Sequence, residues 1–346
     1  MTENAATDVS ATSAPYDSIL VVSFGGPEGM DDVMPFLENV LRGRNVPRER
    51  MLAVAHHYEM FGGVSPINQQ NRDLIAALRQ SLDTHGIALP IYWGNRNWRP
   101  LLPDTLREMA RDGRRHALAY ITSAYSSYSG CRQYLEDIAR AREAVGPGAP
   151  EIDKLRLFYN HPGFIEPMTD HVRDALRQLP GAALVYTAHS VPVTMAATSR
   201  YEAQLREACR LVSEQLDRRD WRLVYQSRSG PPSQPWLGPD IGEHLREIAA
   251  AGVREVVIAP IGFISDHLEV LYDLDTEARA LCDQLGLKMM RAATVGNHPS
   301  FVSMIRELVL ERMGELPPRS LGDLGPDPDV CAPDCCAAPV PPIRVS

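Results

Sequence analysis

Short apolar segments alternate along the chain with segments whose apolar residues recur at helical spacing. Leu74, Ile75, Leu78 and Leu82 are one example of that helical spacing. Eight apolar segments are predicted strands, at residues 18–23, 89–93, 116–122, 155–159, 182–188, 222–226, 255–261 and 287–290. Strands that alternate with helices predict parallel sheets covered by helices on both faces, which is an α/β fold.

Eight strands suit two Rossmann-like domains, each with a four-stranded parallel sheet and with a cleft between them. The Pro- and Gly-rich segment 145–150 is the predicted crossing, so the N-terminal domain would span residues 16–150 and the C-terminal domain residues 151–297. Residues 1–15 are a predicted disordered tail. Residues 316–346 hold 8 of the 28 prolines and 3 of the 6 cysteines, so this second tail needs a partner to become ordered.

Composition and charge exclude several classes of protein. The chain has 35 Lys and Arg against 44 Asp and Glu, a formal charge of −9, and it has no basic cluster, which argues against a nucleic-acid partner. The longest apolar run, residues 256–264, is too short to span a membrane. The first fifteen residues lack the apolar stretch of a signal peptide. We therefore expect a cytoplasmic protein.

Four predicted strands end in the loops S-F-G-G-P (23–27), T-S-A-Y-S-S-Y (122–128), T-A-H-S-V-P (187–192) and P-I-G-F-I-S-D-H (260–267). Ligands of open parallel sheets bind beyond the carboxyl ends of the strands, so these loops should face one cleft. His189 stands at such an end, where an imidazole can hold a metal or accept a proton. The alternative is a strand-end histidine bonded to a backbone carbonyl.

Three carboxylates follow the last of these loops at the spacing i, i+4 and i+8: Glu269, Asp273 and Glu277. On an α-helix they would share one face, and a column of acids leading into the cleft suits the path of a cation. Two alternatives remain open. One is a solvated acidic face, and the other is a capping box formed by Asp266 and Glu269.

Aromatic and basic residues cluster in the remaining loops. Together they suit a large flat ligand with peripheral carboxylates, although core packing and solvated surface are alternatives for each residue. The set is Phe24, Tyr58, Tyr125, Tyr128, Tyr134, Arg42, Arg44 and Arg96. No G-x-G-x-x-G motif opens a helix, so the sequence does not indicate a dinucleotide cofactor.

Cys331, Cys335 and Cys336 lie within six residues of the C-terminal tail, a density that favours metal ligands over disulfides in a reducing compartment. A four-ligand site needs one more thiolate. Cys209 and Cys282 lie on apolar helical stripes and should be core residues, whereas Cys131 follows a strand near the cleft. A zinc site and an unliganded tail are the alternatives to an iron-sulfur cluster.

The chain resembles the ferrochelatases, and among them the actinobacterial coproporphyrin ferrochelatases. The motifs that carry the resemblance lie in order between residues 16 and 315. They are L-V-V-S-F-G-G-P-E (20–28), L-R-G-R (41–44), F-G-G-V-S-P-I-N (61–68), Y-W-G-N-R-N-W (92–98), T-A-H-S-V-P (187–192), Y-Q-S-R-S-G-P-P-S-Q-P-W-L-G-P-D (225–240) and P-I-G-F-I-S-D-H-L-E-V-L-Y-D-L-D (260–275).

This resemblance implies a lyase of haem biosynthesis that inserts its substrate Fe²⁺ into coproporphyrin III and releases two protons. It implies that His189 is the active-site histidine, Glu269 its partner carboxylate, and Asp273 and Glu277 the acidic row behind them. It implies a C-terminal helix, residues 298–315, that returns to the first domain. It also implies a monomer, product hand-off to a coproheme decarboxylase, and a 2Fe-2S cluster on Cys131, Cys331, Cys335 and Cys336.

Phe24, Arg42, Ser65 and Tyr134 match family positions around the porphyrin. Some relatives carry Tyr in place of Phe24, and that phenol can ligate the product iron, so another group such as His189 would have to do so here. Three other functions remain as alternatives: a protoporphyrin IX ferrochelatase, a cobalt or sirohydrochlorin chelatase, and a two-domain protein that binds haem or iron without catalysis.

Overall fold

The computed structural model describes residues 16–43, 46–231 and 233–338, and its strands form two four-stranded parallel sheets. The expected tail at residues 1–15, the end of the C-terminal tail at 339–346 and Arg44 lie outside the described residues. The first sheet has the order β2 (Ile91–Asn95), β1 (Ser18–Ser23), β3 (His116–Ile121), β4 (Glu151–Lys154), and the second has β6 (Trp221–Gln226), β5 (Ala183–His189), β7 (Glu255–Ala259), β8 (Lys288–Arg291). The predicted α/β fold class is confirmed.

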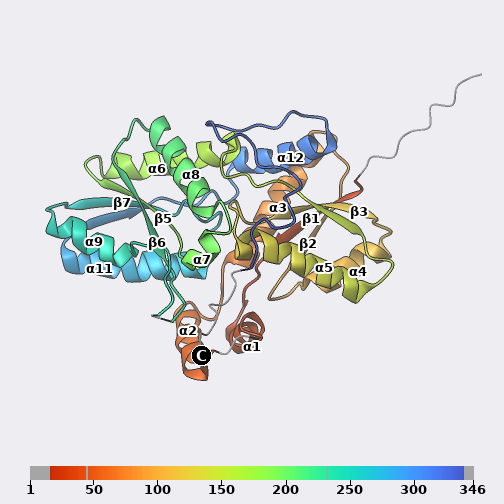
Figure 1. The fold of residues 1–346 in the computed structure, drawn as a ribbon, viewed down its shortest axis with the longest axis horizontal. Helices are drawn as coiled ribbons and strands as arrows, with labels where there is room; N and C mark the ends of the chain where they lie inside the picture. Colours follow the sequence, from red (N-terminus) through yellow and green to blue (C-terminus); the bar gives the residue numbers. More distant parts are fainter. Residues whose placement is uncertain (1–15, 44–45, 232, 339–346) are drawn as a thin grey trace, which may run out of the picture.

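Helices cover both faces of each sheet, and the two sheets lie side by side (Figure 1). In the first half they are α1 (Met30–Val40), α2 (Arg48–Glu59), α3 (Ile67–Thr84), α4 (Leu102–Arg111), the π-helix η1 (Tyr128–Arg132) and α5 (Gln133–Val145). In the second half they are α6 (Pro162–Gln178), α7 (Val193–Ala196), α8 (Tyr201–Gln215), α9 (Ile241–Ala250), α10 (Leu268–Val270), the π-helix η2 (Leu271–Ala278), α11 (Arg279–Leu285) and α12 (Pro299–Met313).

Apolar strands and amphipathic helices account for the core. All six residues of β1 are buried, as expected for a central strand with helices on both faces. In α3 the predicted stripe of Leu74, Ile75, Leu78 and Leu82 is buried. The C-terminal helix α12 packs against both α3 and α6, so it joins the two halves of the molecule.

The predicted strand at residues 155–159 is wrong, and so is the crossing at residues 145–150. The strand that pairs with β3 is β4, whose sequence Glu-Ile-Asp-Lys is polar because it forms the edge of the sheet. In the apolar segment that follows, Leu155 still donates to the Ala119 carbonyl oxygen of β3 at 3.0 Å, but the segment is buried in the largest core cluster and forms no strand of either sheet. The first sheet therefore extends past residue 150, and the chain crosses to the second half after Lys154.

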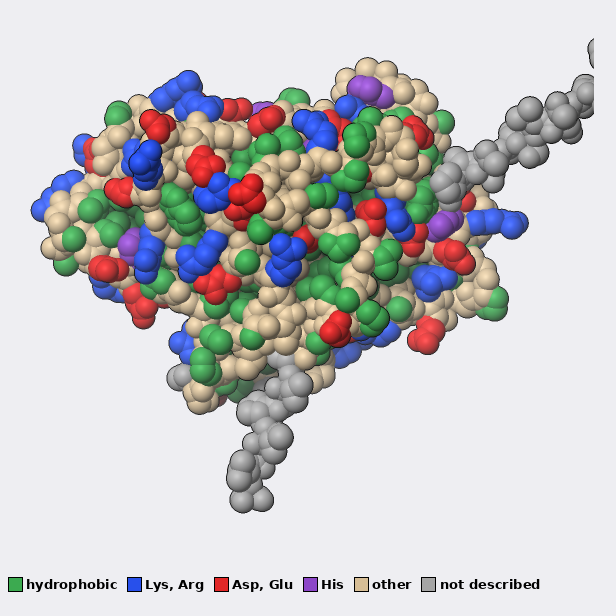
Figure 2. All heavy atoms as spheres, turned by 45° about the horizontal axis from the view of Figure 1, so that its top comes forward, with side chains coloured by type: hydrophobic (Ala, Val, Ile, Leu, Met, Phe, Trp, Pro, Cys, Tyr) green, Lys and Arg blue, Asp and Glu red, His purple; other side chains and the backbone are tan. Residues whose placement is uncertain are grey.

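Helices α1 and α2 project from the body as a flap (Figure 1). They enclose a small apolar cluster of their own, which comprises Val33, Phe36, Leu37 and Ala55. Elsewhere, acidic and basic side chains are interspersed over the face seen in Figure 2. Within the parts of the chain that are described, none of the helices has the length and apolar character needed to cross a lipid bilayer.

Candidate active site

The carboxyl ends of β5 and β6 lie side by side, and they end in His189 and Gln226, which are register partners. The loop after the neighbouring strand β7 leads to α10, which carries Glu269. The prediction that His189 ends a strand of the second sheet is confirmed. Three adjacent strands therefore deliver polar side chains to one edge of this sheet.

His189 and Glu269 form a close pair, with His189 Nε2 3.0 Å from Glu269 Oε1. The two side chains are 36% and 39% exposed, so the pair is open to a ligand. His189 Nδ1 lies against the carbonyl oxygen of Ser190, to which it donates. The alternative of a strand-end histidine bonded to a backbone carbonyl therefore accounts for Nδ1 only. The other ring nitrogen, Nε2, faces Glu269.

Charge and burial act in opposite directions on this pair. Burial lowers the pKa of His189, but the charge of Glu269 and its hydrogen bond outweigh burial and raise that pKa to about 9. Burial likewise works to raise the pKa of Glu269, but the positive charge of His189 lowers it to about 2. The free site therefore holds an imidazolium beside a carboxylate at neutral pH.

Asp273 lies beside this pair and behaves differently. Burial and the charge of Glu269 raise the pKa of Asp273 to about 7. The Asp273 carboxylate accepts hydrogen bonds from Gln226 Nε2 at 3.2 Å and from Ser227 Oγ. Ser227 has a φ of 64°, a strained value for a residue with a side chain. Its conformation therefore holds a polar side chain against the acidic group.

The expected single α-helix for the acidic row is wrong. Glu269 lies in α10, while Asp273 and Glu277 lie in the π-helix η2, whose turns are wider than those of an α-helix. The three carboxylates still act on one another, since the charges of both Glu269 and Glu277 raise the pKa of Asp273. The capping-box alternative is also wrong, because the N-cap of α10 is His267 and has no side-chain cap hydrogen bond, while Asp266 pairs with Arg291 at 2.9 Å.

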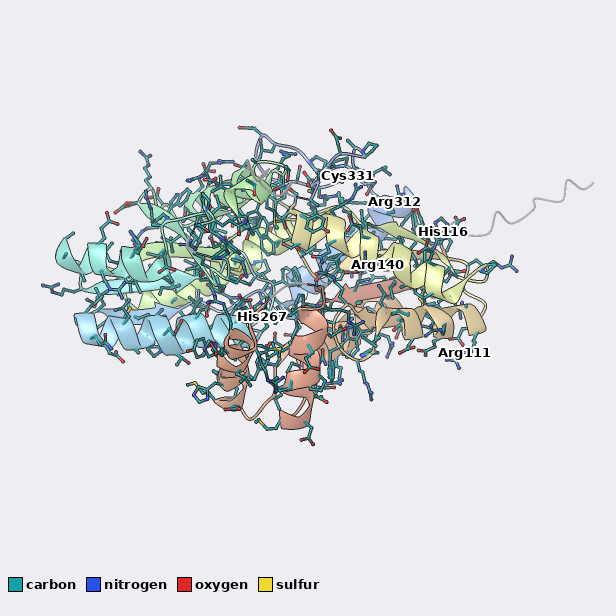
Figure 3. All side chains as sticks on the ribbon, turned by 60° about the horizontal axis from the view of Figure 1, so that its bottom comes forward. Arg111, His116, Arg140, His267, Arg312 and Cys331 are labelled. Carbon is teal, nitrogen blue, oxygen red and sulfur yellow. The ribbon has the colours of Figure 1, made fainter. Side chains whose placement is uncertain are left out.

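Sequence reasoning missed three residues of this site: Gln226, Ser227 and His267. His267 lies in the middle of the molecule (Figure 3), where burial lowers its pKa and where it interacts with Glu269. One signal for Gln226 and His267 was present in the sequence, because both lie at or beyond the carboxyl ends of predicted strands.

The flap helix α2 reaches the same region. The ring of His57 stacks on Tyr272 of η2, with ring centroids 3.7 Å apart and planes 14° apart. In Tyr58, the next residue, burial and then the negative charge of Glu269 raise the pKa of the phenol. The flap therefore packs directly against the helix that carries the acidic row.

Phe24 and Arg42 are exposed, as a ligand contact requires. Ser65 is buried beside Gly26, where a Cβ would come within 2.7 Å of the Ser65 side chain. Tyr134 is buried in the core of the first half, beneath the guanidinium of Arg96 at 4.4 Å. The structure therefore does not bring Tyr134 to the surface beside Phe24.

Three other members of the aromatic and basic cluster have structural partners. Arg96 lies 5.9 Å from the ring of Phe24, and its charge is paired with Asp137. Tyr125 is buried and donates to the carbonyl oxygen of Ile261 at 2.8 Å, which links the two halves of the molecule. The hydroxyl of Tyr128 bonds to Glu136 at 3.0 Å. These residues support the walls of the site.

The cysteines of the tail lie next to Cys131. Cys335 Sγ and Cys336 Sγ are 3.5 Å apart, and the Cys131 thiol interacts with those of Cys331 and Cys336. The contact with Cys131, followed by burial, raises the pKa of the Cys331 thiol. The predicted core positions of the other two cysteines are confirmed, since Cys209 and Cys282 are fully buried in helices.

Four thiols match a 2Fe-2S cluster in number and chemistry. As they stand, however, no group of three or more His, Cys, Asp or Glu side chains in residues 16–43, 46–231 and 233–338 has an arrangement that could hold a metal ion. The expected cluster is therefore not shown.

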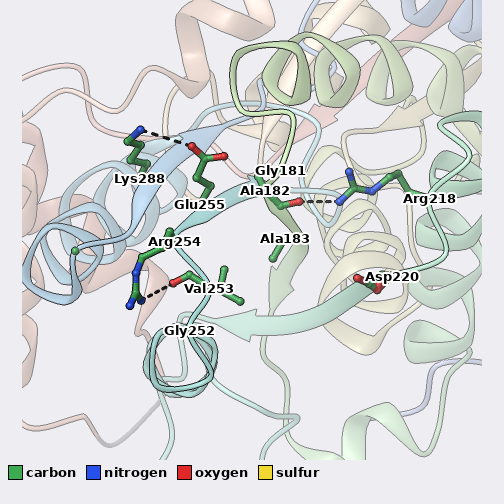
Figure 4. A pocket seen from close by; sticks show the side chains of 11 residues that line it. Gly181, Ala182, Ala183, Arg218, Asp220, Gly252, Val253, Arg254, Glu255 and Lys288 are labelled. Atoms are coloured by element: carbon green, nitrogen blue, oxygen red, sulfur yellow. Dashed lines mark hydrogen bonds and ion pairs between the residues drawn. The ribbon is translucent and has the colours of Figure 1, made fainter.

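A surface hollow of about 590 Å³ lies at the opposite edge of the second sheet, at the amino ends of its strands (Figure 4). Arg218 in its wall donates to the Ala182 carbonyl oxygen at 2.7 Å, and Lys288 pairs with Glu255 at 3.6 Å. The hollow therefore lies on the side of the sheet away from His189, and its basic side chains are bonded to groups of its own wall.

Comparisons with known proteins point to one family. A family model described as Ferrochelatase matches residues 16–313. The chain is 60% identical over 329 residues to a ferrochelatase of Rhodopirellula baltica, covering 93% of each chain. It is 53% identical over 357 residues to a coproporphyrin III ferrochelatase of Streptomyces coelicolor, covering 95% of each. Among solved structures, SirB from Bacillus subtilis with Fe³⁺ is similar in fold, with a TM-score of 0.53 at 12% identity over 86% of this chain and 97% of that one.

Proposed function

Because this chain belongs to the ferrochelatase family and inserts a metal into a porphyrin, we propose that its substrates are ferrous iron and coproporphyrin III. The reaction is a lyase step of haem biosynthesis and yields coproheme and two protons. The pair of His189 Nε2 and Glu269 Oε1 at 3.0 Å, beside Asp273, is the observation that carries this proposal.

Metal insertion needs an anionic group for the cation and a base for the pyrrole protons. Imidazole nitrogen and carboxylate oxygen both suit Fe²⁺. In the free site the charge of Glu269 keeps His189 protonated. A cation that binds Glu269 neutralises that charge and lowers the pKa of His189. The imidazole then loses its proton to solvent and becomes the base that accepts the two pyrrole protons one after the other and passes each to solvent.

The acidic row supplies the route for iron. Burial and neighbouring charge raise the pKa of Asp273 to about 7, so an arriving cation favours its ionised form. Asp273 and Glu277 therefore attract Fe²⁺ and deliver it towards Glu269, and an Asp273 that is still protonated gives up its proton when the cation binds.

The porphyrin would lie against the exposed ring of Phe24, and Arg42 and Ser65 would contact its carboxylates. Arg96 is already paired with Asp137, which leaves Arg42 as the freer cation for a propionate. Tyr134 would act from beneath Arg96. The four carboxylates of coproporphyrin, together with the names of the relatives, favour it over protoporphyrin IX. Since Phe24 carries no hydroxyl, His189 is the proposed ligand of the product iron once it has passed the last pyrrole proton to solvent.

The decisive experiment is anaerobic mixing of the purified protein with Fe²⁺ and coproporphyrin III while the porphyrin absorbance is followed. Catalytic turnover is expected, and His189→Ala should abolish it while porphyrin binding persists. A stoichiometric change without turnover would favour the binding-protein alternative. Faster turnover with protoporphyrin IX, or with cobalt and sirohydrochlorin, would replace the proposed substrates.

We propose further that Cys131, Cys331, Cys335 and Cys336 hold a 2Fe-2S cluster, which would require loss of the thiol protons and a rearrangement of the four sulfurs around the two irons. The proximity of the four thiols supports this proposal. A brown protein whose iron and sulfide are lost in Cys131→Ser is expected. Zinc in place of iron, or colour that survives Cys131→Ser, would contradict the cluster or its fourth ligand.

Hand-off of coproheme to a decarboxylase, a monomeric state and a cytoplasmic location stay predictions. Light scattering of the purified protein measures its molar mass and so tests the monomeric state. Mixing it with a coproheme decarboxylase and following product transfer tests the hand-off.

A further inference from the structure

The C-terminal tail beyond α12 runs over the body in close contact with it. The backbone nitrogen of Leu321 donates to the Asn160 carbonyl oxygen at 2.8 Å, and Asn160 Nδ2 donates to the Gly325 carbonyl oxygen at 2.8 Å. Gly322 lies so near α8 that a Cβ there would come within 2.0 Å of Glu207 Oε1. These contacts fix the path of the tail and bring Asp327 to the first turn of α8.

Asp327 is a carboxylate only 8% exposed, and both of its oxygens are used. Oδ1 accepts from Arg200 Nη1 at 3.1 Å, and Oδ2 accepts from Gln204 Nε2 at 2.8 Å. Arg200 is the residue before α8, and Gln204 lies in its first turn. The tail therefore holds the beginning of this helix through a buried, charge-assisted contact.

The same turn is tied to the first half of the molecule. Gln204 Oε1 accepts from the backbone nitrogen of Ser126 at 2.7 Å, and the backbone nitrogen of Arg200 donates to Ser126 Oγ at 3.1 Å. Gln204 is fully buried, so both ends of its amide are committed, one to the tail and one to the loop after β3. The orientation of this turn is consequently determined from both sides.

Tyr201 connects this turn to the site. Its ring is 6% exposed, and its hydroxyl donates to the backbone carbonyl oxygen of His189 at 2.9 Å. His189 is the last residue of β5, and beyond it the backbone nitrogen of Ser190 donates to the Gln226 carbonyl oxygen at 2.8 Å. The hydroxyl of Tyr201 is the side-chain contact to the carbonyl oxygen of His189 itself, and Tyr201 follows Arg200 directly in the chain.

We infer that Asp327 is a positioning residue for His189, acting through Arg200, Gln204 and Tyr201. This inference rests on the proposed function, because it takes His189 as the reacting base. It gives the tail a part in metal insertion that is separate from any metal bound by its cysteines, since the contacts of Asp327 involve none of the cysteines.

The test is the steady-state kinetics of Asp327→Asn with Fe²⁺ and coproporphyrin III. An asparagine offers one acceptor oxygen, so either Arg200 or Gln204 loses its bond. We expect kcat to fall about tenfold, the size typical of groups that orient a metal-site residue, with KM for the porphyrin unchanged. Asp329→Asn is the matched control, since Asp329 lies in the same tail but faces Arg312 of α12 at 3.7 Å. The control should keep the kcat of the parent protein.

A double-mutant cycle separates positioning from general loosening. Tyr201→Phe removes the hydroxyl that reaches His189, and it should lower kcat by a similar factor. Asp327→Asn combined with Tyr201→Phe should lose no more than about the larger single effect, because both act on one route. Arg200→Gln is a second variant on the same route, and because the Arg200 side chain is 50% exposed its replacement should leave the fold intact.

Three results would overturn the inference. The first is a kcat of Asp327→Asn that equals the kcat of the control Asp329→Asn. If Asp327→Asn does not fold, the kcat of Arg200→Gln takes its place in this comparison. The second is a double variant whose loss equals the product of the two single losses. The third is a change confined to KM. Absence of turnover in the unmodified protein would instead overturn the proposed function, and this inference with it.

Discussion

Replacing Glu269 by glutamine should change the charge of His189 at neutral pH. In the free protein His189 Nε2 lies 3.0 Å from Glu269 Oε1. The charge and hydrogen bond of Glu269 outweigh burial and raise the pKa of His189 from 6.5 to about 9. Glutamine keeps the size of the side chain and one acceptor oxygen but removes the charge. Burial, which lowers the pKa of His189, is then opposed only by the hydrogen bond to Ser190 and the charge of Asp273.

The size of the change follows from the geometry. A pKa of 9 leaves about 97% of the imidazole protonated at pH 7.5, whereas a pKa of 6.5 leaves about 10%. The two side chains are 36% and 39% exposed, so solvent screens part of the attraction. We therefore expect the pKa of His189 to fall by about 1–2.5 units in Glu269→Gln.

NMR titration of histidine-labelled, metal-free protein measures this pKa directly, and His189→Ala assigns the resonance among the ten histidines. Glu277→Gln is a matched control because it removes a carboxylate of the same row that does not contact His189. Its His189 pKa should stay close to that of the parent protein. A fall of less than about half a unit in Glu269→Gln, or an equal fall in both variants, would refute the assignment of the pair.

The same pair has a consequence for stability. A histidine whose folded pKa is raised stabilises the protein fully below its unfolded value of 6.5, and this contribution is lost as the pH rises through about 9. Glu269, whose folded pKa is about 2, contributes above 4.5 and loses its contribution as the pH falls through 2. The stability lost in Glu269→Gln should therefore be greatest between pH 4.5 and 6.5 and should shrink towards pH 9.

Three further predictions concern other parts of the molecule. Asp273→Asn removes a carboxyl group whose folded pKa is raised from 3.8 to about 7, so the variant should be more stable than the parent protein by about 1–2 kcal/mol. Melting curves should show a larger stabilisation at pH 8 than at pH 5, and an equal stabilisation at both would contradict the burial of that charge. Arg42→Ala and Ser65→Ala should raise KM for coproporphyrin III more than for protoporphyrin IX, because the former has more carboxylates to lose contacts from; equal effects would count against the proposed substrate. Arg156→Met leaves the buried Glu311 carboxylate without its 2.7 Å partner and should cost about 3–5 kcal/mol in denaturant titrations, while a loss under about 1 kcal/mol would show that the pair is solvated.

The fold was predictable because its central strands are apolar and its helices amphipathic. The edge strand β4 could not be predicted, because it pairs with a neighbour on one side only and its sequence is polar. It therefore lacks the run of apolar residues that identifies a buried strand. The apolar segment after it was mistaken for the strand because burial between the two halves imposes the same composition as burial within a sheet.

The site was predictable where a residue's position in the fold determines its role. His189 ends a central strand and Glu269 follows the next one, so both could be placed at one edge. Ser227 could not be placed in the site from the sequence, because its contact with Asp273 depends on a left-handed backbone conformation that is rare for serine. Nor could the contacts of Asp327, since they join segments more than a hundred residues apart.

The flap formed by α1 and α2 has its own small apolar cluster, distinct from the cores that hold the two sheets. A unit with so few buried side chains has a lower free energy of local opening than the body beneath it. Amide hydrogens in α1 and α2 should therefore exchange by a movement that leaves both sheets folded. The stack of His57 on Tyr272 joins this unit to the helix that carries Asp273 and Glu277, so each opening breaks that contact. Mild denaturant should therefore change turnover before it changes the circular dichroism of the whole chain.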